Sequence, residues 1–201
     1  MRKAAADSRT KHKLLDAAEE LMLSKGYTAT AVDEVCAAAG LTKGSFFHYF
    51  EGKEHLGRLV ADRFFSARKQ QLLAAPFRQL KDPLDRLFGY LEFLIEMSRR
   101  AEAGKGCLLG TFVQELSDTH PKIRSVCAAC FDEQASMLKR DLDLAKAKYA
   151  PRARWSTQSL AEHLIAVMQG AIIMAKAKQD RKAIEQNLVH FREYLKSVFG
   201  R

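Results

Sequence analysis

The stretch TAVDEVCAAAGLTKGSFFHYFEGK, from Thr30 to Lys53, predicts a helix, a three-residue turn and a second helix. Thr30 is expected to N-cap the first helix, with Asp33 in the capping-box position three residues later. Gly40 can adopt the left-handed conformation that closes this helix, and Thr42 can cap the next one. The spacing therefore predicts a helix-turn-helix at about residues 31–50.

The second helix of this motif has two faces of different character. Phe46, Tyr49 and Phe50 are expected to pack inward. The outward residues form a short polar face of the size that enters a DNA major groove. These residues are Thr42, Lys43, Gly44, Ser45, Phe47 and His48.

The charge of the chain is basic overall but unevenly distributed. The net charge is +9, yet residues 1–60 carry 9 Lys and Arg against 8 Asp and Glu. The first 13 residues carry five basic side chains against Asp7, so the excess near the motif is confined to the N-terminus, where it can contact phosphate. Overall charge alone therefore does not establish DNA binding.

Outside the motif, long periodic segments predict an all-α protein with an N-terminal three-helix module and a C-terminal helical bundle. With 47% hydrophobic residues and 4 prolines, the chain can bury a real core. We expect a DNA-binding domain at residues 1–53 and a ligand-binding and dimerisation domain at 54–201. The expected helices span residues 10–25, 53–75, 83–98, 106–116, 121–148, 157–178 and 181–199.

The last two of these helices have wide apolar stripes that can serve both the internal core and a partner. Gly170 is expected to allow a close approach within the first of them. The stripes could instead pack only against their own chain. We favour a homodimer, because one helix-turn-helix reads few bases and such proteins bind paired half-sites.

Several other classes of protein are disfavoured by the sequence. No apolar signal region opens the chain and no run is expected to reach the length of a membrane span, so we expect a cytoplasmic protein with free thiols. No glycine-rich phosphate loop or hydrolase motif indicates an enzyme or a cofactor. Cys127 and Cys130 form C-x-x-C inside a helix without further ligands, so no metal site is predicted.

Residues 10–56 resemble the DNA-binding domain of the tetracycline-repressor-like (TetR) family. The resemblance is carried by Gly26-Tyr27, Thr30–Val35, the run Ala39–Ser45, Phe47–Phe50 and Lys53-Glu54. It implies base contacts from the outward residues of the second helix and phosphate contacts from Thr30, Tyr49 and Lys53. Phe47 departs from the family pattern, which has a tyrosine there, and Tyr49 departs from the usual histidine.

Cys107 is the candidate for a chemical trigger, because it follows Gly106 at the start of a predicted helix, where the helix dipole favours a thiolate. The alternative is a small buried residue with no chemistry. The run Gly-Cys-Leu-Leu-Gly resembles a branch of the family in which a cysteine senses reactive electrophiles, and Lys176 matches a lysine that lies near it there. Gln114, His163 and Gln169, with Glu115, are further candidates for polar anchors in a ligand pocket.

These observations predict a sequence-specific DNA-binding regulator, a repressor that a small molecule or modification of Cys107 releases from a palindromic DNA operator. The alternative hypothesis is a helix-turn-helix that serves protein contact without specific DNA binding. It predicts that Lys43→Ala and His48→Ala leave weak DNA binding unchanged.

Overall fold

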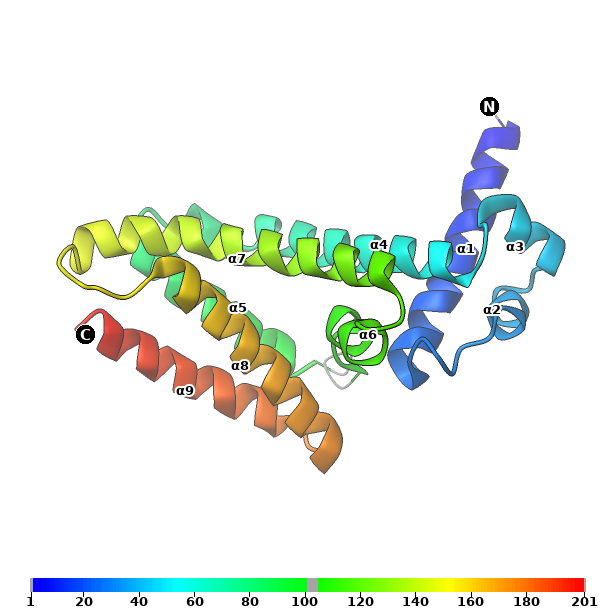
Figure 1. Cartoon of the computed structure of the whole chain (residues 1–201). Helices are drawn as coiled ribbons and strands as arrows, with labels where there is room; N and C mark the ends of the chain where they lie inside the picture. The colour runs from blue at the N-terminus through cyan, green and yellow to red at the C-terminus, as the bar shows by residue number, and fades with distance from the viewer. Residues whose placement is uncertain (1, 101–104, 201) are drawn as a thin grey trace. The chain divides into compact units, whose positions relative to one another are not determined.

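The computed structural model describes residues 2–100 and 105–200, with side chains from residue 8 onward. All regular structure in these ranges is helical (Figure 1). The elements are α1 (Arg2–Lys25), α2 (Val32–Ala39), α3 (Lys43–Tyr49), α4 (Lys53–Ala74), the 3-10 helix η1 (Pro76–Gln79), α5 (Pro83–Ser98), α6 (Leu108–Leu116), α7 (Pro121–Tyr149), α8 (Thr157–Lys178) and α9 (Lys182–Val198). The all-α fold expected from the sequence is confirmed.

The chain forms two compact units that do not follow a single cut in the sequence. The first unit contains residues 1–69 and 107–130, and the second contains residues 70–106 and 131–201. The helix α6 and the start of α7 therefore belong with the predicted DNA-binding module, although the sequence suggested one linear boundary after residue 53.

The first unit is built on α1, which packs against α2, α3 and α6. The apolar face of α1 is buried at Leu14, Ala18 and Met22. Gly26 ends the helix with a φ of 89°, a left-handed conformation that costs a glycine nothing. Tyr27 then enters the core, where its ring meets the ring of Phe112 edge to face at a centroid distance of 5.6 Å.

The helix-turn-helix forms where the sequence predicts it, with one correction at its start. The N-cap of α2 is Ala31, because the hydroxyl of Thr30 instead donates to the carbonyl of Gly26 at 2.7 Å. Glu34, rather than Asp33, bonds back to the N–H of Ala31 at 2.8 Å. Gly40 closes α2 at φ 65°, and the N–H of Leu41 reaches the carbonyl of Cys36, which satisfies the helix end.

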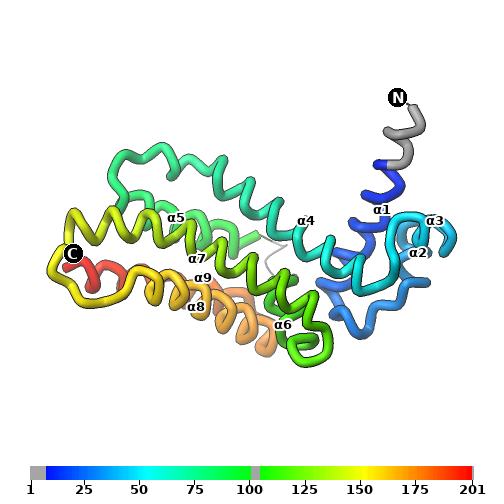
Figure 2. Tube along the Cα trace, turned by 45° about the horizontal axis from the view of Figure 1, so that its top comes forward, coloured from blue at the N-terminus to red at the C-terminus, as the bar shows by residue number. Residues whose placement is uncertain are grey.

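The second unit has α8 and α9 side by side, with α5 packed against α9 (Figures 1 and 2). The N-cap of α5 is Asp82, whose carboxylate accepts the N–H of Leu84 at 2.8 Å. The same carboxylate accepts hydrogen bonds from Lys148 and Tyr149 at the end of α7. One acidic residue thus joins the start of α5 to the end of α7.

The helix α8 is long and apolar, and only part of its apolar surface is buried. Contrary to the expectation from the sequence, it has the length and hydropathy of a membrane span, but only 28% of its apolar window is buried. Between Ala166 and Met174 its exposed residues are small or apolar, namely Ala166, Gly170, Ile173 and Met174, whereas Lys176 and Lys178 are exposed in its last turn. One such helix is weak support for a membrane span, and an apolar face of this kind also suits a protein partner.

Candidate functional site

The inner face of α3 anchors it in the first unit. Phe46 and Phe50 are 0% and 1% exposed, and their ring centroids are 5.2 Å apart. Thr42 caps the helix as predicted, accepting the N–H of Ser45 at 3.2 Å. These contacts fix the rotation of a helix that is only seven residues long, and so decide which side chains point outward.

The outer face of α3 carries the residues that the sequence predicts to contact bases. Phe47 is 59% exposed although its neighbour Phe46 is completely buried. Lys43 forms an exposed ion pair with Asp33 at 2.7 Å, and the hydrogen bond that its ammonium donates to that carboxylate raises the pKa of the lysine. His48 is exposed, and its ring meets the ring of Tyr49 edge to face at 4.7 Å.

Gly44 lies on this face without a visible structural reason for being glycine. A Cβ placed there would meet only the hydroxyl of Thr42, at 3.6 Å, among the described residues. Glycine within a helix costs about 0.5–1 kcal/mol relative to alanine. Packing within the described chain therefore gives no reason for a glycine at position 44.

Two of the residues assigned to phosphate contact are occupied within the protein. Thr30 is 0% exposed and its hydroxyl is bonded to Gly26, so its side chain is not available to a phosphate. Lys53 is half-buried at the start of α4, where its ammonium donates to the carbonyl of Thr28 at 3.2 Å and lies 4.4 Å from the centre of the Tyr27 ring. Burial lowers the pKa of Lys53. A phosphate contact from Lys53 stays a prediction.

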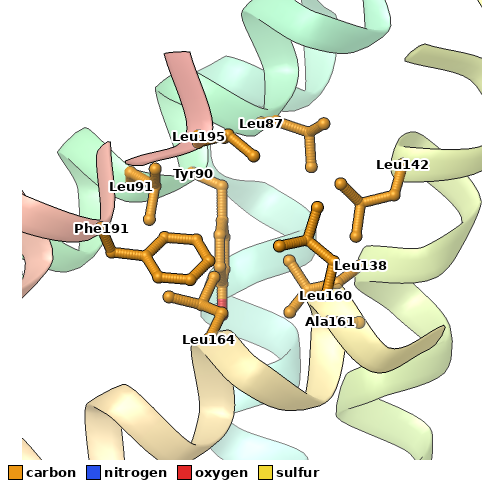
Figure 3. Close-up of a pocket in the computed structure, with 10 residues that line it drawn as sticks. All are labelled: Leu87, Tyr90, Leu91, Leu138, Leu142, Leu160, Ala161, Leu164, Phe191 and Leu195. Carbon is orange, nitrogen blue, oxygen red and sulfur yellow. The ribbon is translucent and has the colours of Figure 1, made fainter. Parts of the chain in front are cut away.

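A small apolar cavity lies in the core of the second unit (Figure 3). Its volume of about 10 Å³ is enough for roughly one water molecule. Tyr90 extends into the ring of leucines that surrounds it, and burial raises the pKa of this tyrosine, whose side chain is hydrogen-bonded to Gln134. The lining residues are Leu87, Tyr90, Leu91, Leu138, Leu142, Leu160, Ala161, Leu164, Phe191 and Leu195.

The polar residues predicted to anchor a ligand do not line this cavity. Gln114 is exposed on α6 and donates to the carbonyl of Gly110 in its own helix at 3.0 Å. His163 lies on α8 in an open groove of about 340 Å³, where its ring contacts those of Phe191 and Tyr194. Gln169 is half-buried on α8. Tyr90, which the sequence analysis did not single out, is one of the buried residues of α5.

The structure places Cys107 at the N-cap of α6, half-buried, as the sequence suggested. Cys36, Cys127 and Cys130 are buried. Burial raises the pKa of the Cys127 thiol to about 12, so this thiol is protonated at neutral pH. Lys176 lies in the last turn of α8 in the second unit. Its side chain packs against Gly106, where a Cβ would come within 2.6 Å of the Cε atom of Lys176.

Both parts of the chain match known protein families. Residues 14–58 match the family described as bacterial regulatory proteins, tetR family, and residues 83–191 match the tetracyclin repressor-like C-terminal domain. The HTH-type transcriptional repressor DhaR of Mycobacterium sp. (strain GP1) is 30% identical over 175 residues, which are 87% of this chain and 86% of DhaR. The repressor NemR of Escherichia coli (strain K12) is 25% identical over 92% of this chain and 94% of NemR.

Solved structures agree with this assignment. The crystal structure of E. coli NemR in its reduced form superposes with a TM-score of 0.78 at 26% identity, over 90% of this chain and 94% of that one. A TetR transcriptional regulator from Chloroflexus aurantiacus superposes with a TM-score of 0.85 at 25% identity, over 98% and 97%. With a helix-turn-helix whose second helix presents an exposed face, and with both domains matched, this chain belongs to the TetR family of DNA-binding transcriptional repressors.

Proposed function

We propose that this repressor binds a palindromic operator as a homodimer, with α3 of each copy in the major groove. The observation that carries the proposal is the outer face of α3, where Phe47 is 59% exposed and Gly44 has no packing role. Lys43 and His48 on the same face supply hydrogen-bond donors for base edges. Tyr49 and Lys53 are the proposed phosphate contacts.

The proposed dimer interface is the exposed apolar face of α8, together with α9. Gly170 supports it, because apart from the neighbouring backbone of α8 itself no atom of the described chain lies within 4 Å of the Cβ position there. The close approach expected from the sequence therefore does not occur within the described chain. A second copy can use the space, since small residues let helix backbones pack closely.

We propose two alternative triggers for release from DNA, both acting in the cytoplasm. A small apolar molecule could open the cavity around Tyr90, whose hydroxyl and Gln134 would supply the polar contact. Alternatively, an electrophile could modify Cys107, the one cysteine of the four that is not buried. The relatives include the E. coli repressor NemR, solved in a reduced form.

The experiment that tests the function is selection of bound sequences from a random double-stranded DNA pool. Enrichment of a palindrome that is bound less well by Lys43→Ala supports the proposal, because Lys43 lies on the outer face of α3. Failure to enrich any sequence at low salt would refute operator binding. Insensitivity to Lys43→Ala and His48→Ala would favour the protein-contact alternative.

The same selection, repeated with N-ethylmaleimide and with Cys107→Ser, separates the two triggers. Loss of the palindrome on alkylation only when Cys107 is present supports thiol sensing. Mass spectrometry should find the reagent on Cys107 ahead of the three buried cysteines. Binding that resists alkylation in both proteins would leave a non-covalent ligand as the trigger.

A further inference from the structure

The turn between α1 and α2 is held by residues far away in the sequence. It runs from Gly26 to Thr30 and sets the direction in which α2 leaves α1. Within the turn, the N–H of Thr30 bonds to the carbonyl of Tyr27 at 3.1 Å and the hydroxyl of Thr30 to the carbonyl of Gly26. Those bonds leave the N–H and the carbonyl of Thr28 to find partners outside the turn.

Two side chains from other helices supply these partners. The N–H of Thr28 donates to the Oε2 atom of Glu115, at the end of α6, at 2.9 Å. The carbonyl of Thr28 accepts a hydrogen bond from the ammonium of Lys53, at the start of α4, at 3.2 Å. We call this pair of bonds the Thr28 clamp. All of its members lie in the first unit.

Gly26 provides the space that the clamp needs. A Cβ at Gly26 would come within 2.9 Å of the Cδ atom of Glu115, closer than real Cβ atoms approach carbon. The carboxylate therefore packs directly over the bare backbone of the turn. The requirement for glycine at this position comes from its φ of 89°, because the carboxylate of Glu115 is the end of a flexible side chain that can shift.

The neighbouring ring contacts keep the clamp in place. The ring of Tyr27 lies between the start of α4 and the facing helices, at centroid distances of 5.6 Å from Phe112 and 5.2 Å from His120. Lys53 lies over the same ring. The carboxylate of Glu115 acts to raise the pKa of Lys53, but burial of the ammonium has the larger effect and lowers it.

We propose that Glu115 is a positioning residue for DNA binding. Although α6 lies outside the sequence motif that reads DNA, Glu115 fixes the turn from which α2 and α3 extend. A loose turn would let α3 sample many orientations, and ordering it on the operator would cost affinity. The inference rests on the proposed function, because it needs an operator to which α3 binds.

Two substitutions separate the reach of this side chain from its charge. Glu115→Asp keeps the charge but is shorter by one methylene, so it cannot reach the N–H of Thr28 from its present backbone position. Glu115→Gln keeps the reach and an acceptor oxygen but loses the charge. Asp118→Asn, an exposed carboxylate just after α6, is the matched control.

The measurement is operator affinity of the full-length variants, with the active fraction of each counted by stoichiometric titration. We expect Glu115→Asp to bind about fivefold more weakly, since one hydrogen bond to a backbone N–H contributes on the order of 1 kcal/mol. Glu115→Gln and Asp118→Asn should stay within about twofold of wild type. Amide exchange at Thr28 should be faster in Glu115→Asp alone.

Two results would overturn the inference. The first is faster exchange at Thr28 with unchanged operator affinity, because the clamp would then be lost without consequence. The second is weaker binding that disappears once affinity is expressed per active molecule, because Glu115 would then serve stability alone. Failure of the proposed function looks different, since the unmodified protein itself would then select no operator.

Discussion

At the scale of single residues, replacing Gly44 is expected to change stability and DNA affinity in opposite directions. Gly44→Ala should raise the free energy of unfolding by about 0.5–1 kcal/mol, because alanine is the better helix former and the free protein has room for its methyl group. The same methyl group should weaken operator binding if the backbone of α3 approaches DNA closely. Thermal unfolding and operator titration of one variant check both expectations. A more stable protein with undiminished affinity would show that Gly44 does not approach DNA.

Asp33 is a second residue whose effect on DNA affinity has a defined sign. Its carboxylate pairs with Lys43 at 2.7 Å in the free protein and places a negative charge beside the recognition helix. Asp33→Asn should therefore strengthen operator binding severalfold at low salt, with a smaller gain at high salt because exposed charges are screened. Fluorescence anisotropy at two salt concentrations measures this. The control Asp62→Asn makes the same charge change on α4 and should have less effect.

At the scale of single elements, the start of α5 depends on one ionised carboxylate. The hydrogen bond from Lys148, then that from Tyr149, holds the pKa of Asp82 far below its ordinary value. A lowered pKa in the folded state means that the ionised form stabilises the fold above the unfolded pKa of about 3.9, and that this stabilisation is lost as the pH falls below it.

Asp82→Asn should therefore lower the unfolding temperature at pH 7, and the difference from wild type should shrink as the pH drops below about 4. Thermal scans between pH 7 and pH 3 follow both proteins. Asp85→Asn, which changes an exposed carboxylate in the first turn of the same helix, is the comparison. If the difference in unfolding temperature between Asp82→Asn and wild type stays constant across this pH range, the contribution of Asp82 to stability does not depend on its charge.

The elements also show where sequence reasoning succeeds. Gly40 and Thr42 were predicted correctly, because a helix end and a cap are decided by neighbouring residues. Thr30 was wrongly predicted as a cap, because its hydroxyl found a carbonyl four residues back instead of the next helix. The roles of Glu115 and Tyr90 could not be predicted, because each depends on a helix distant in sequence. The 3-10 helix η1 was missed for lack of a periodic pattern over four residues.

At the scale of the whole molecule, charge and symmetry should act together. The net charge of +9 is spread widely, and residues 1–60 contribute only +1 of it. One copy of the helix-turn-helix therefore brings few cations to the phosphates. Strong operator binding then depends on two copies engaging neighbouring half-sites at once, with about one counterion released for each phosphate neutralised.

Gly170→Glu tests this dependence on two copies. The position is exposed on α8, and glutamate favours a helix more than glycine does, so the variant should fold. A charge in the proposed apolar interface should shift the protein to monomers in sedimentation. Ser136→Glu, on the exposed surface of α7, should leave the assembly unchanged.

The slope of operator affinity against salt concentration, both on logarithmic scales, then reports the number of phosphate contacts. We expect a slope for Gly170→Glu of about half the wild-type value, because a monomer neutralises the phosphates of one half-site. A monomeric variant that keeps the full slope would show that one copy makes all the contacts. A variant that remains dimeric would place the interface away from the exposed face of α8.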